Sequence, residues 1–450
     1  MQKLLVWVDA RFPLIKVWEE HLAKYYAPKN FNFWYYFGSL ALLVLVIQIV
    51  TGIFLTMYYK PDAVLAFASV EYIMRDVPWG WLLRYMHSTG ASAFFIVIYL
   101  HIFRGMLYGS YRSPRELIWI IGMIIFISLM AESFMGYLLP WGNMSYWGAQ
   151  VIISLFDAVP LVGPPLAEWI RGDFVVSDAT ITRFFSLHVI AIPLVLAGLV
   201  FLHIVALHKV GSNNPDGIEI KEHKGRDGVP LDGIPFHPYY TVKDMVGVTV
   251  FLILFSAVMF FTPEFGGWFL EHDNFVPANI LQTPPEIKPL WYLTPYYSVL
   301  RATTEQMLLV LAVLLIAFAA LTFFSVRTLA AKGATLGSTA VVLIGFYALE
   351  AKVWGVFLMG LSLVVYFLLP WLDRSPVKSI RYRGWMYKTA LIIFAVSFVV
   401  LGYCGTRPPE GIYKALAQVS TVLYFAFFFL MPWYTTYDRT KPVPDRVNGP

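Results

Sequence analysis

Long apolar stretches recur along this chain, and each could cross the roughly 30 Å hydrocarbon layer of a membrane as an α-helix. A segment in lipid must satisfy its own backbone hydrogen bonds, which favours helices at this length. The chain is also 58% hydrophobic and only 14% charged, unlike an ordinary soluble protein. We therefore predict an all-α, polytopic transmembrane protein, with stretches at 33–58, 81–108, 117–138, 183–208, 245–262, 303–325, 352–371, 387–404 and 413–433.

The opening segment, residues 1–32, is amphipathic rather than uniformly apolar. It lacks the compact apolar core and the small-residue cleavage site of a secretory signal. Such a segment is typical of a helix that lies on the membrane surface, and we expect the mature protein to keep it. Its charged residues are Asp9, Arg11, Lys16, Glu19, Glu20 and Lys24.

Basic residues gather in alternate loops, which predicts the side of the membrane for each loop. They cluster at both ends of the chain and in the loops near 104–115, 209–226 and 374–383. Because Lys and Arg near spans tend to stay in the cytoplasm, both termini are expected there, in a bacterial inner membrane. The outer side would hold 59–80, 139–182, 263–302 and 405–412. No nucleic-acid partner is expected.

The single cysteine, Cys404, limits the redox chemistry that this chain can support alone. One thiol excludes an internal disulfide, a thiolate-bound iron–sulfur cluster within the chain and the CxxCH pattern of covalent haem attachment. Any redox centre here must use other ligands.

Four histidines stand in two pairs within apolar spans. His87 and His101 are fourteen residues apart in one span, and His188 and His203 are fifteen apart in another. Fourteen helical residues return a side chain to within about 40° of its starting face and raise it by about 21 Å. Two helices with such pairs could offer one imidazole each to a centre near either membrane surface.

The fifteen-residue step overshoots that face by about 60° in a regular helix. Pro193 lies between the two histidines. We therefore predict a proline kink or a one-residue π-bulge that restores their alignment.

Alternative roles for these histidines are polar packing between helices, or proton coupling in a secondary transporter. Two matched pairs favour a ligand role over packing. Zinc is disfavoured because no cysteine or carboxylate joins them at metal-site spacing. Two imidazoles on opposite helices suit a six-coordinate haem iron.

Glycines and arginines near these spans fit the same interpretation. Glycine in a membrane helix is often only a packing device, but one pair on each of two other spans repeats the fourteen-residue step: Gly38 with Gly52, and Gly122 with Gly136. That step predicts room for two haems. Arg84 and Arg104 stand three residues outside His87 and His101, where cations could pair with haem propionates.

Several segments resemble the cytochrome b subunits of bc1 complexes, in that family's order. They read RYMHSTGASAFFIVIYLHIFRG, GYLLPWGNMSYWGAQVI, RFFSLHVIAIPLVLAGLVFLHIVALH, GSNNP and IPFHPYYTVKD. The resemblance implies a di-haem four-helix bundle at 33–215 with two non-covalent b haems. A C-terminal group of membrane helices at 216–450 would follow, with an outer quinol-site loop at 263–302.

The resemblance also implies a division of labour among the residues. His87 and His188 would bind the iron of an outer haem, and His101 and His203 that of an inner haem. An outer site would oxidise quinol beside the loop 136–152 and the segment 289–292, with Tyr137 and Tyr292 among its residues. An inner site would reduce quinone, and its residues would be His208, Ser212, Asn213, Lys243 and Asp244.

The outer site departs from the family pattern. Many members read Pro-Glu-Trp-Tyr, and that Glu is proposed to accept a quinol proton, whereas this chain has Leu290 at that place. Leucine cannot accept a proton. Glu132, deep in an apolar span where an idle charge is costly, is the expected substitute, and structural pairing with a cation is the alternative. Weaker candidates are Glu271, Asp273 and Glu286.

An insertion is the second departure, because the family usually has only a short linker after Arg301. About forty extra residues bring the stretch 303–325 and a run at 339–350 that looks too short to span alone. We predict an additional hairpin at about 303–350 that dips into or across the membrane.

The expected function is that of cytochrome b in a ubiquinol:cytochrome c oxidoreductase, the catalytic subunit of a proton-translocating respiratory complex. One quinol electron would pass through the two haems to the inner site. The resemblance implies a homodimeric complex, active only with a Rieske iron–sulfur protein and cytochrome c1, in contact with lipid and ubiquinone. Rivals are a b6f-like complex and the di-haem anchor of a hydrogenase or formate dehydrogenase.

Overall fold

The computed structural model describes residues 2–19 and 25–447. It confirms the all-α transmembrane prediction, because ten helices among the described residues are long and apolar enough to cross a membrane. They are α3 (Tyr36–Thr56), α5 (Gly80–Tyr108), α6 (Glu116–Leu138), α9 (Asp178–Ser186) continued by η3 (Leu187–Ala191) and α10 (Ile192–Val210), η5 (Phe236–Tyr240) with α11 (Thr241–Phe261), α13 (Glu305–Ser325), α14 (Leu329–Ala348), α15 (Ala351–Val364) with η8 (Val365–Leu368) and α16 (Leu369–Leu372), α17 (Trp385–Gly405) and α18 (Gly411–Phe429).

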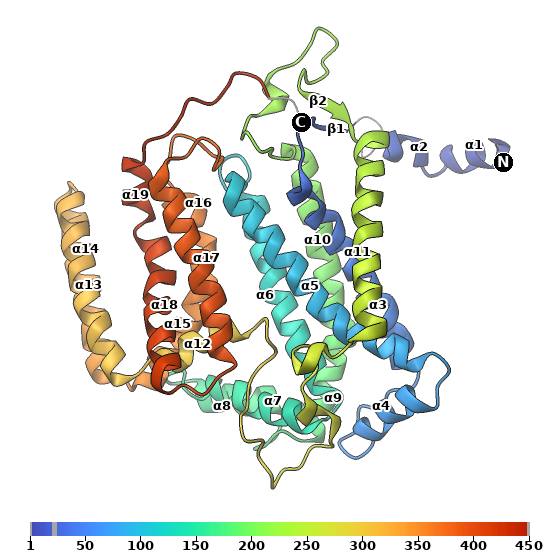
Figure 1. Cartoon of the computed structure of the whole chain (residues 1–450), viewed down its shortest axis with the longest axis vertical. Helices are drawn as coiled ribbons and strands as arrows, with labels where there is room; N and C mark the ends of the chain where they lie inside the picture. The colour runs from blue at the N-terminus through green and yellow to red at the C-terminus, as the bar shows by residue number, and fades with distance from the viewer. Residues whose placement is uncertain (1, 20–24, 448–450) are drawn as a thin grey trace.

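Shorter elements cover the two ends of the spans (Figure 1). They are α1 (Gln2–Asp9), α2 (Leu14–Trp18), β1 (Tyr26–Pro28), α4 (Ala66–Arg75), α7 (Asn143–Phe156), α8 (Gly163–Arg171), β2 (Gly233–Pro235), α12 (Thr294–Ala302) and α19 (Met431–Tyr437), with short 3₁₀ turns between them. We call the end that holds β1, β2 and 438–447 the terminal face, at the top of Figure 1. The opposite face holds α4, α7, α8 and the loop 262–293.

The helices form two groups that share one apolar core. In the first group α3 packs on α5 and α6 packs on α10, and in the second α12 packs on α15, α17 and α18. Helix α12 and the residues before it join the groups, since the ring of Tyr292 stacks on Phe95 with centroids 3.8 Å apart. Tyr296 of α12 packs between Phe126 and Phe398. These aromatic contacts hold the segment 289–292 against the first group.

The predicted hairpin is present as α13 and α14, at the left edge of Figure 1. Helix α13 packs on the second group through Phe318, whose ring meets Phe429 and Trp433. Helix α14 is 20 residues long and none of its described side chains is buried. The predicted length of this second arm was therefore wrong. The first half of α14 is rich in small and polar residues, so the apolar run in the sequence is shorter than the helix. The helix nevertheless continues through these residues, because its backbone hydrogen bonds are local.

The amphipathic opening segment is broken into separate elements in its described part. Pro13 caps α2, and proline fits only the first turn of a helix, so α1 and α2 are separate. The expectation for residues 20–24 lies outside the described residues. Beyond them β1 pairs antiparallel with β2, with Tyr26 opposite Pro235 and Pro28 opposite Gly233.

Buried ion pairs on the terminal face join the two groups. Arg115, after α5, donates to both carboxylate oxygens of Glu219 at 2.6 and 2.7 Å, and Lys378 donates to the same group at 2.6 Å. Burial opposes ionisation of Glu219, but the hydrogen bonds of Arg115 and Lys378 outweigh it and lower the pKa of that carboxyl. Nearby, Asp373 accepts hydrogen bonds from Tyr111 and Arg383.

Replacing Arg383 by Met should strongly destabilise the fold, because the Arg383 and Asp373 side chains are both fully buried. Removing one member leaves an unpaired buried charge, at a cost of about 3–5 kcal/mol. The measurement is the midpoint of thermal unfolding of the detergent-solubilised protein. The control is Arg75→Met, which breaks the exposed pair with Glu71 and should cost at most about 0.5 kcal/mol. Equal midpoints for the two variants would contradict the role of the buried pair.

Candidate functional site

The structure brings the four histidines together as two facing pairs. His87 and His188 have ring centroids 6.0 Å apart with planes at 88°, and His101 and His203 have centroids 6.4 Å apart at 61°. A metal–imidazole bond is about 2 Å long, so each gap has room for one metal atom between two ring nitrogens. The first pair lies toward the opposite face and the second toward the terminal face, as α5 and α10 run (Figure 1).

A π turn brings His188 and His203 onto the same face of their span. Residues Leu187–Ala191 form this turn, which contains His188, and Pro193 follows in the first turn of α10. A π turn inserts one extra residue into a helix, which compensates for the step of fifteen. Of the two predicted distortions, a proline kink or a one-residue π-bulge, the structure contains the π-bulge.

A glycine on a neighbouring helix faces each histidine. A β-carbon built on Gly38 would lie 3.4 Å from Cε1 of His101, and one on Gly52 would lie 3.2 Å from Cε1 of His87. The corresponding distance is 3.3 Å for Gly122 and His203, and only 2.3 Å for Gly136 and His188. These helix surfaces therefore leave space beside all four rings that any larger residue would fill.

The Nδ1 atoms of His87 and His188 both have hydrogen-bond partners. Nδ1 of His87 lies 3.0 Å from the Thr51 hydroxyl oxygen. Nδ1 of His188 lies 2.9 Å from the backbone carbonyl oxygen of Glu132 and 3.0 Å from Oε1 of that side chain. A partner at Nδ1 fixes the tautomer and leaves Nε2 free for a metal.

The donor set and its surroundings fit a haem. In the described chain, no group of three or more His, Cys, Asp or Glu residues converges on one point, so each centre offers two imidazoles, as six-coordinate haem requires. Arg104 has a buried Nε without a hydrogen-bond partner and lies over the Tyr35 ring, 4.8 Å from its centroid. Arg84 is partly buried one turn before His87.

A cavity of about 380 Å³ opens beside the second histidine pair. It extends from that pair toward the terminal face. Ten of the predicted residues line it: Gly38, His101, Arg104, Gly122, His203, His208, Ser212, Asn213, Lys243 and Asp244. The structure therefore joins the predicted inner haem position and the predicted quinone-reducing residues in one space.

Polar groups line the terminal end of this cavity. The ring of His208 packs against Tyr25 with centroids 4.6 Å apart, and the Tyr25 hydroxyl lies 3.1 Å from that of Ser212. Asn213 donates from Nδ2 to the Tyr108 carbonyl at 2.8 Å, while its Oδ1 is buried without a partner. Tyr25 could not be predicted from the sequence, because an aromatic residue in an amphipathic segment gives no signal of a distant partner.

A second polar cluster lies toward the opposite face. The Tyr137 hydroxyl donates to Oε2 of Glu271 at 2.8 Å. Burial raises the pKa of Glu271 to about 7, although the hydrogen bond from Tyr137 lowers it in part. Tyr292 is 2% exposed and Leu290 6% exposed, so the segment that carries Leu290 is buried. The Tyr292 side chain lies near enough to Tyr137 and Glu271 to interact electrostatically with both.

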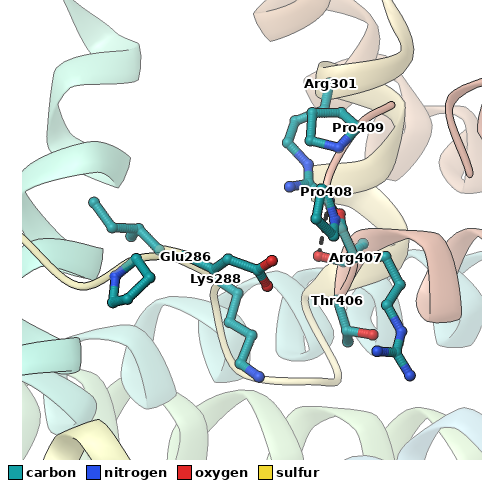
Figure 2. A pocket seen from close by; sticks show the side chains of 10 residues that line it. Glu286, Lys288, Arg301, Thr406, Arg407, Pro408 and Pro409 are labelled. Atoms are coloured by element: carbon teal, nitrogen blue, oxygen red, sulfur yellow. Dashed lines mark hydrogen bonds between the residues drawn. The ribbon is translucent and has the colours of Figure 1, made fainter. Parts of the chain in front are cut away.

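Glu286 lies in a different pocket, with a volume of about 310 Å³. Figure 2 shows Glu286 and Lys288 on the loop before α12, across from Arg301 and Arg407. The side chain of Arg301 donates to the backbone carbonyls of Cys404, Gly405 and Arg407. Glu286 thus shares the lining of this pocket with Lys288, Arg301 and Arg407, whereas the Glu271 carboxylate bonds to the Tyr137 hydroxyl.

Comparisons with known proteins agree with this geometry. The family model described as Cytochrome b/b6/petB matches residues 22–211, and that described as Cytochrome b(C-terminal)/b6/petD matches 277–425. The chain is 58% identical to a cytochrome b of Allochromatium vinosum, over 99% of this chain and 98% of the relative. It is 39% identical to a cytochrome b/c1 of Bradyrhizobium diazoefficiens, over 99% of this chain and 56% of the relative.

The solved structure of a hyperthermophilic respiratory complex III is also similar. One of its chains superimposes with a TM-score of 0.79 at 34% sequence identity. The match covers 96% of this chain and 98% of the other.

Gly136→Ala tests the predicted binding of a haem by His87 and His188, and we expect it to abolish that binding. The new β-carbon would lie 2.3 Å from Cε1 and 2.8 Å from Nε2 of His188, so the ring must move. Haem per chain, measured by reduced-minus-oxidised spectra of the purified protein, should fall by half. The control is Gly198→Ala, where the β-carbon meets nothing within 4 Å. An unchanged haem content in Gly136→Ala would show that this glycine does not shape a haem site.

Proposed function

This chain belongs to the cytochrome b family, in the form found in complex III, and from that premise we propose that it oxidises quinol at one face and reduces quinone at the other. The carrying observation is the arrangement of two facing histidine pairs at two depths, the second of which shares a cavity with His208, Lys243 and Asp244. The family is haem-binding and its complex is an oxidoreductase. The protein is a multi-pass membrane protein, and the ten spans agree with that.

The proposed haem ligands are His87 with His188, and His101 with His203. Two b haems held there would supply one-electron transfer across the membrane, over a helix rise of about 21 Å between ligands on α5. The four glycines keep larger side chains out of this space, and Arg104 offers its unpartnered Nε to an acidic group. Arg84 is proposed for the same task at the other pair.

The proposed quinone-reducing site lies at the terminal end of the larger cavity. Reduction of a quinone takes up two protons, and His208 and Asp244 are groups that can deliver them from the terminal face. Lys243 lies over the Tyr240 ring, 5.4 Å from its centroid, and adds a positive charge at the cavity wall. Ser212 and Asn213 offer hydrogen-bonding groups to the quinone oxygens.

The proposed quinol-oxidising site lies by Tyr137, Glu271 and Tyr292. Quinol loses two protons on oxidation, so the site needs an acceptor that is ionised at working pH. Glu271 fits because its carboxylate is buried, hydrogen-bonded by Tyr137 and has a pKa of about 7. Glu132, the substitute expected from the sequence, stays a prediction, and so do Asp273 and Glu286. Of these, Glu132 already has one carboxylate oxygen on His188.

The wider assembly follows from the same proposal. We place the terminal face in the cytoplasm of a bacterial cell, because most of the basic residues lie there. The electron acceptors would be a Rieske protein and cytochrome c1, in a homodimeric complex with ubiquinone as substrate. A di-haem anchor would not need the buried segment 289–292. A secondary transporter would not need four glycines opposite four histidines.

The pH dependence of quinol oxidation tests the acceptor. The rate of quinol-dependent cytochrome c reduction by the purified complex should rise as the pH increases through about 7, because the Glu271 carboxyl accepts a proton only when ionised. Glu271→Gln should lower the rate about 100-fold, within the usual range for loss of a general base, and remove that pH step. Glu168→Gln, at an exposed carboxylate of α8 on the same face, is the matched control, with little expected change.

The outcomes separate two claims. If Glu132→Gln rather than Glu271→Gln removes the pH step, the acceptor is Glu132 and the role of Glu271 is refuted. If the unmodified complex does not reduce cytochrome c with quinol at all, the proposed function itself fails.

A further inference from the structure

Glu132 on α6 makes an unusual double contact with His188. Both its backbone carbonyl oxygen, at 2.9 Å, and its carboxylate Oε1, at 3.0 Å, lie within hydrogen-bond distance of Nδ1. Gly136, one turn further along α6, faces the same ring. The helix thus provides both the space for the imidazole and two acceptors for its proton.

No other member of the histidine set has such a partner. Within the described residues, no carboxylate bonds to Nδ1 of His87, His101 or His203. The acceptor for His87 is the Thr51 hydroxyl, whose own proton goes to the Ile47 carbonyl at 2.6 Å. The His87–His188 pair thus has a hydroxyl and a carboxylate at its two Nδ1 atoms, whereas Nδ1 of His101 and of His203 has no hydrogen-bond partner in the described chain.

The position of this carboxylate is costly for a membrane helix. The side chains of Glu132 and His188 are each only 15% exposed, and Oε2 of Glu132 is buried without a hydrogen-bond partner. A carboxylate in such surroundings loses most of its hydration. The contact with His188 is the one direct polar interaction that its side chain makes among the described residues.

We propose that Glu132 is a positioning residue that orients His188 and lowers the reduction potential of the haem that His188 helps to bind. The inference rests on the proposed ligation by His87 and His188. A carboxylate that accepts the Nδ1 proton makes the imidazole a stronger electron donor and adds negative charge near the iron. Both effects favour the oxidised iron over the reduced one.

The consequence is a difference in potential between the two centres. Electrons move spontaneously toward the higher potential, so lowering the potential at the His87–His188 pair favours transfer toward the His101–His203 pair. The carboxylate thus gives direction to the electron path through its charge and its bond to His188.

Redox titration of both haems in the purified complex, monitored by visible spectra, tests the inference. Glu132→Gln keeps the side-chain size, one acceptor oxygen and the backbone carbonyl bond, but removes the charge. The haem of the His87–His188 pair should shift to a more positive potential by about 59 mV, which is tenfold in the one-electron equilibrium. The potential of the other haem should not move.

Two further variants complete the design. Glu132→Asp keeps the charge and should stay nearer to the native potential than Glu132→Gln. Thr51→Val removes the neutral partner of His87 and should shift the same haem by less than Glu132→Gln does.

The results distinguish this inference from the proposed function. Two haems with native potentials in Glu132→Gln would overturn the role of Glu132 while leaving the function intact. If Glu132→Gln fails to hold haem, Glu132→Asp is compared with a haem-containing variant that lacks a carboxylate, such as Glu132→Thr. Equal potentials in these two variants would also overturn the role of Glu132. Absence of haem in the unmodified chain would instead defeat the proposed function.

Discussion

The separation of facing imidazoles across two helix pairs is the constraint on which the rest of this structure depends. Ring centroids 6.0 and 6.4 Å apart leave space for a metal atom but not for side chains from neighbouring helices. Glycines on α3 and α6 meet that requirement at all four rings. The π turn at His188 meets a second requirement, the alignment of His188 with His203. Without this turn, the two histidines could not both face α5.

Two buried carboxylates with different partners lie toward the opposite face. Glu271 lies in the loop on the opposite face and bonds to Tyr137, and burial brings its pKa to about 7. Glu132 lies deeper, and its side chain bonds to a histidine rather than to a tyrosine. One group is thus placed to exchange a proton with a quinol, and the other to adjust a haem ligand. Polar contacts such as Lys378–Glu219 and Tyr111–Asp373 serve a third purpose, because they join the two helix groups.

The sequence predicted those parts of the structure that depend on spacing within one helix. The spans, the histidine pairs, the glycine pairs and the distortion near Pro193 all follow from helix periodicity or from the thickness of a membrane. Partners from distant segments could not be predicted this way. The bond between Tyr137 and Glu271 and the contact of Tyr25 with His208 depend on how loops fold back onto the spans. The length of α14 was underestimated because hydropathy alone understates a helix rich in small residues.

Haem quantitation on the purified complex, before and after His203→Leu, would show whether these histidines bind haem. We expect two b haems per chain in the unmodified protein and one in the variant. The remaining haem should keep the spectrum of the His87–His188 centre. Two haems in His203→Leu, or none in the unmodified protein, would contradict the assignment of these histidines as haem ligands.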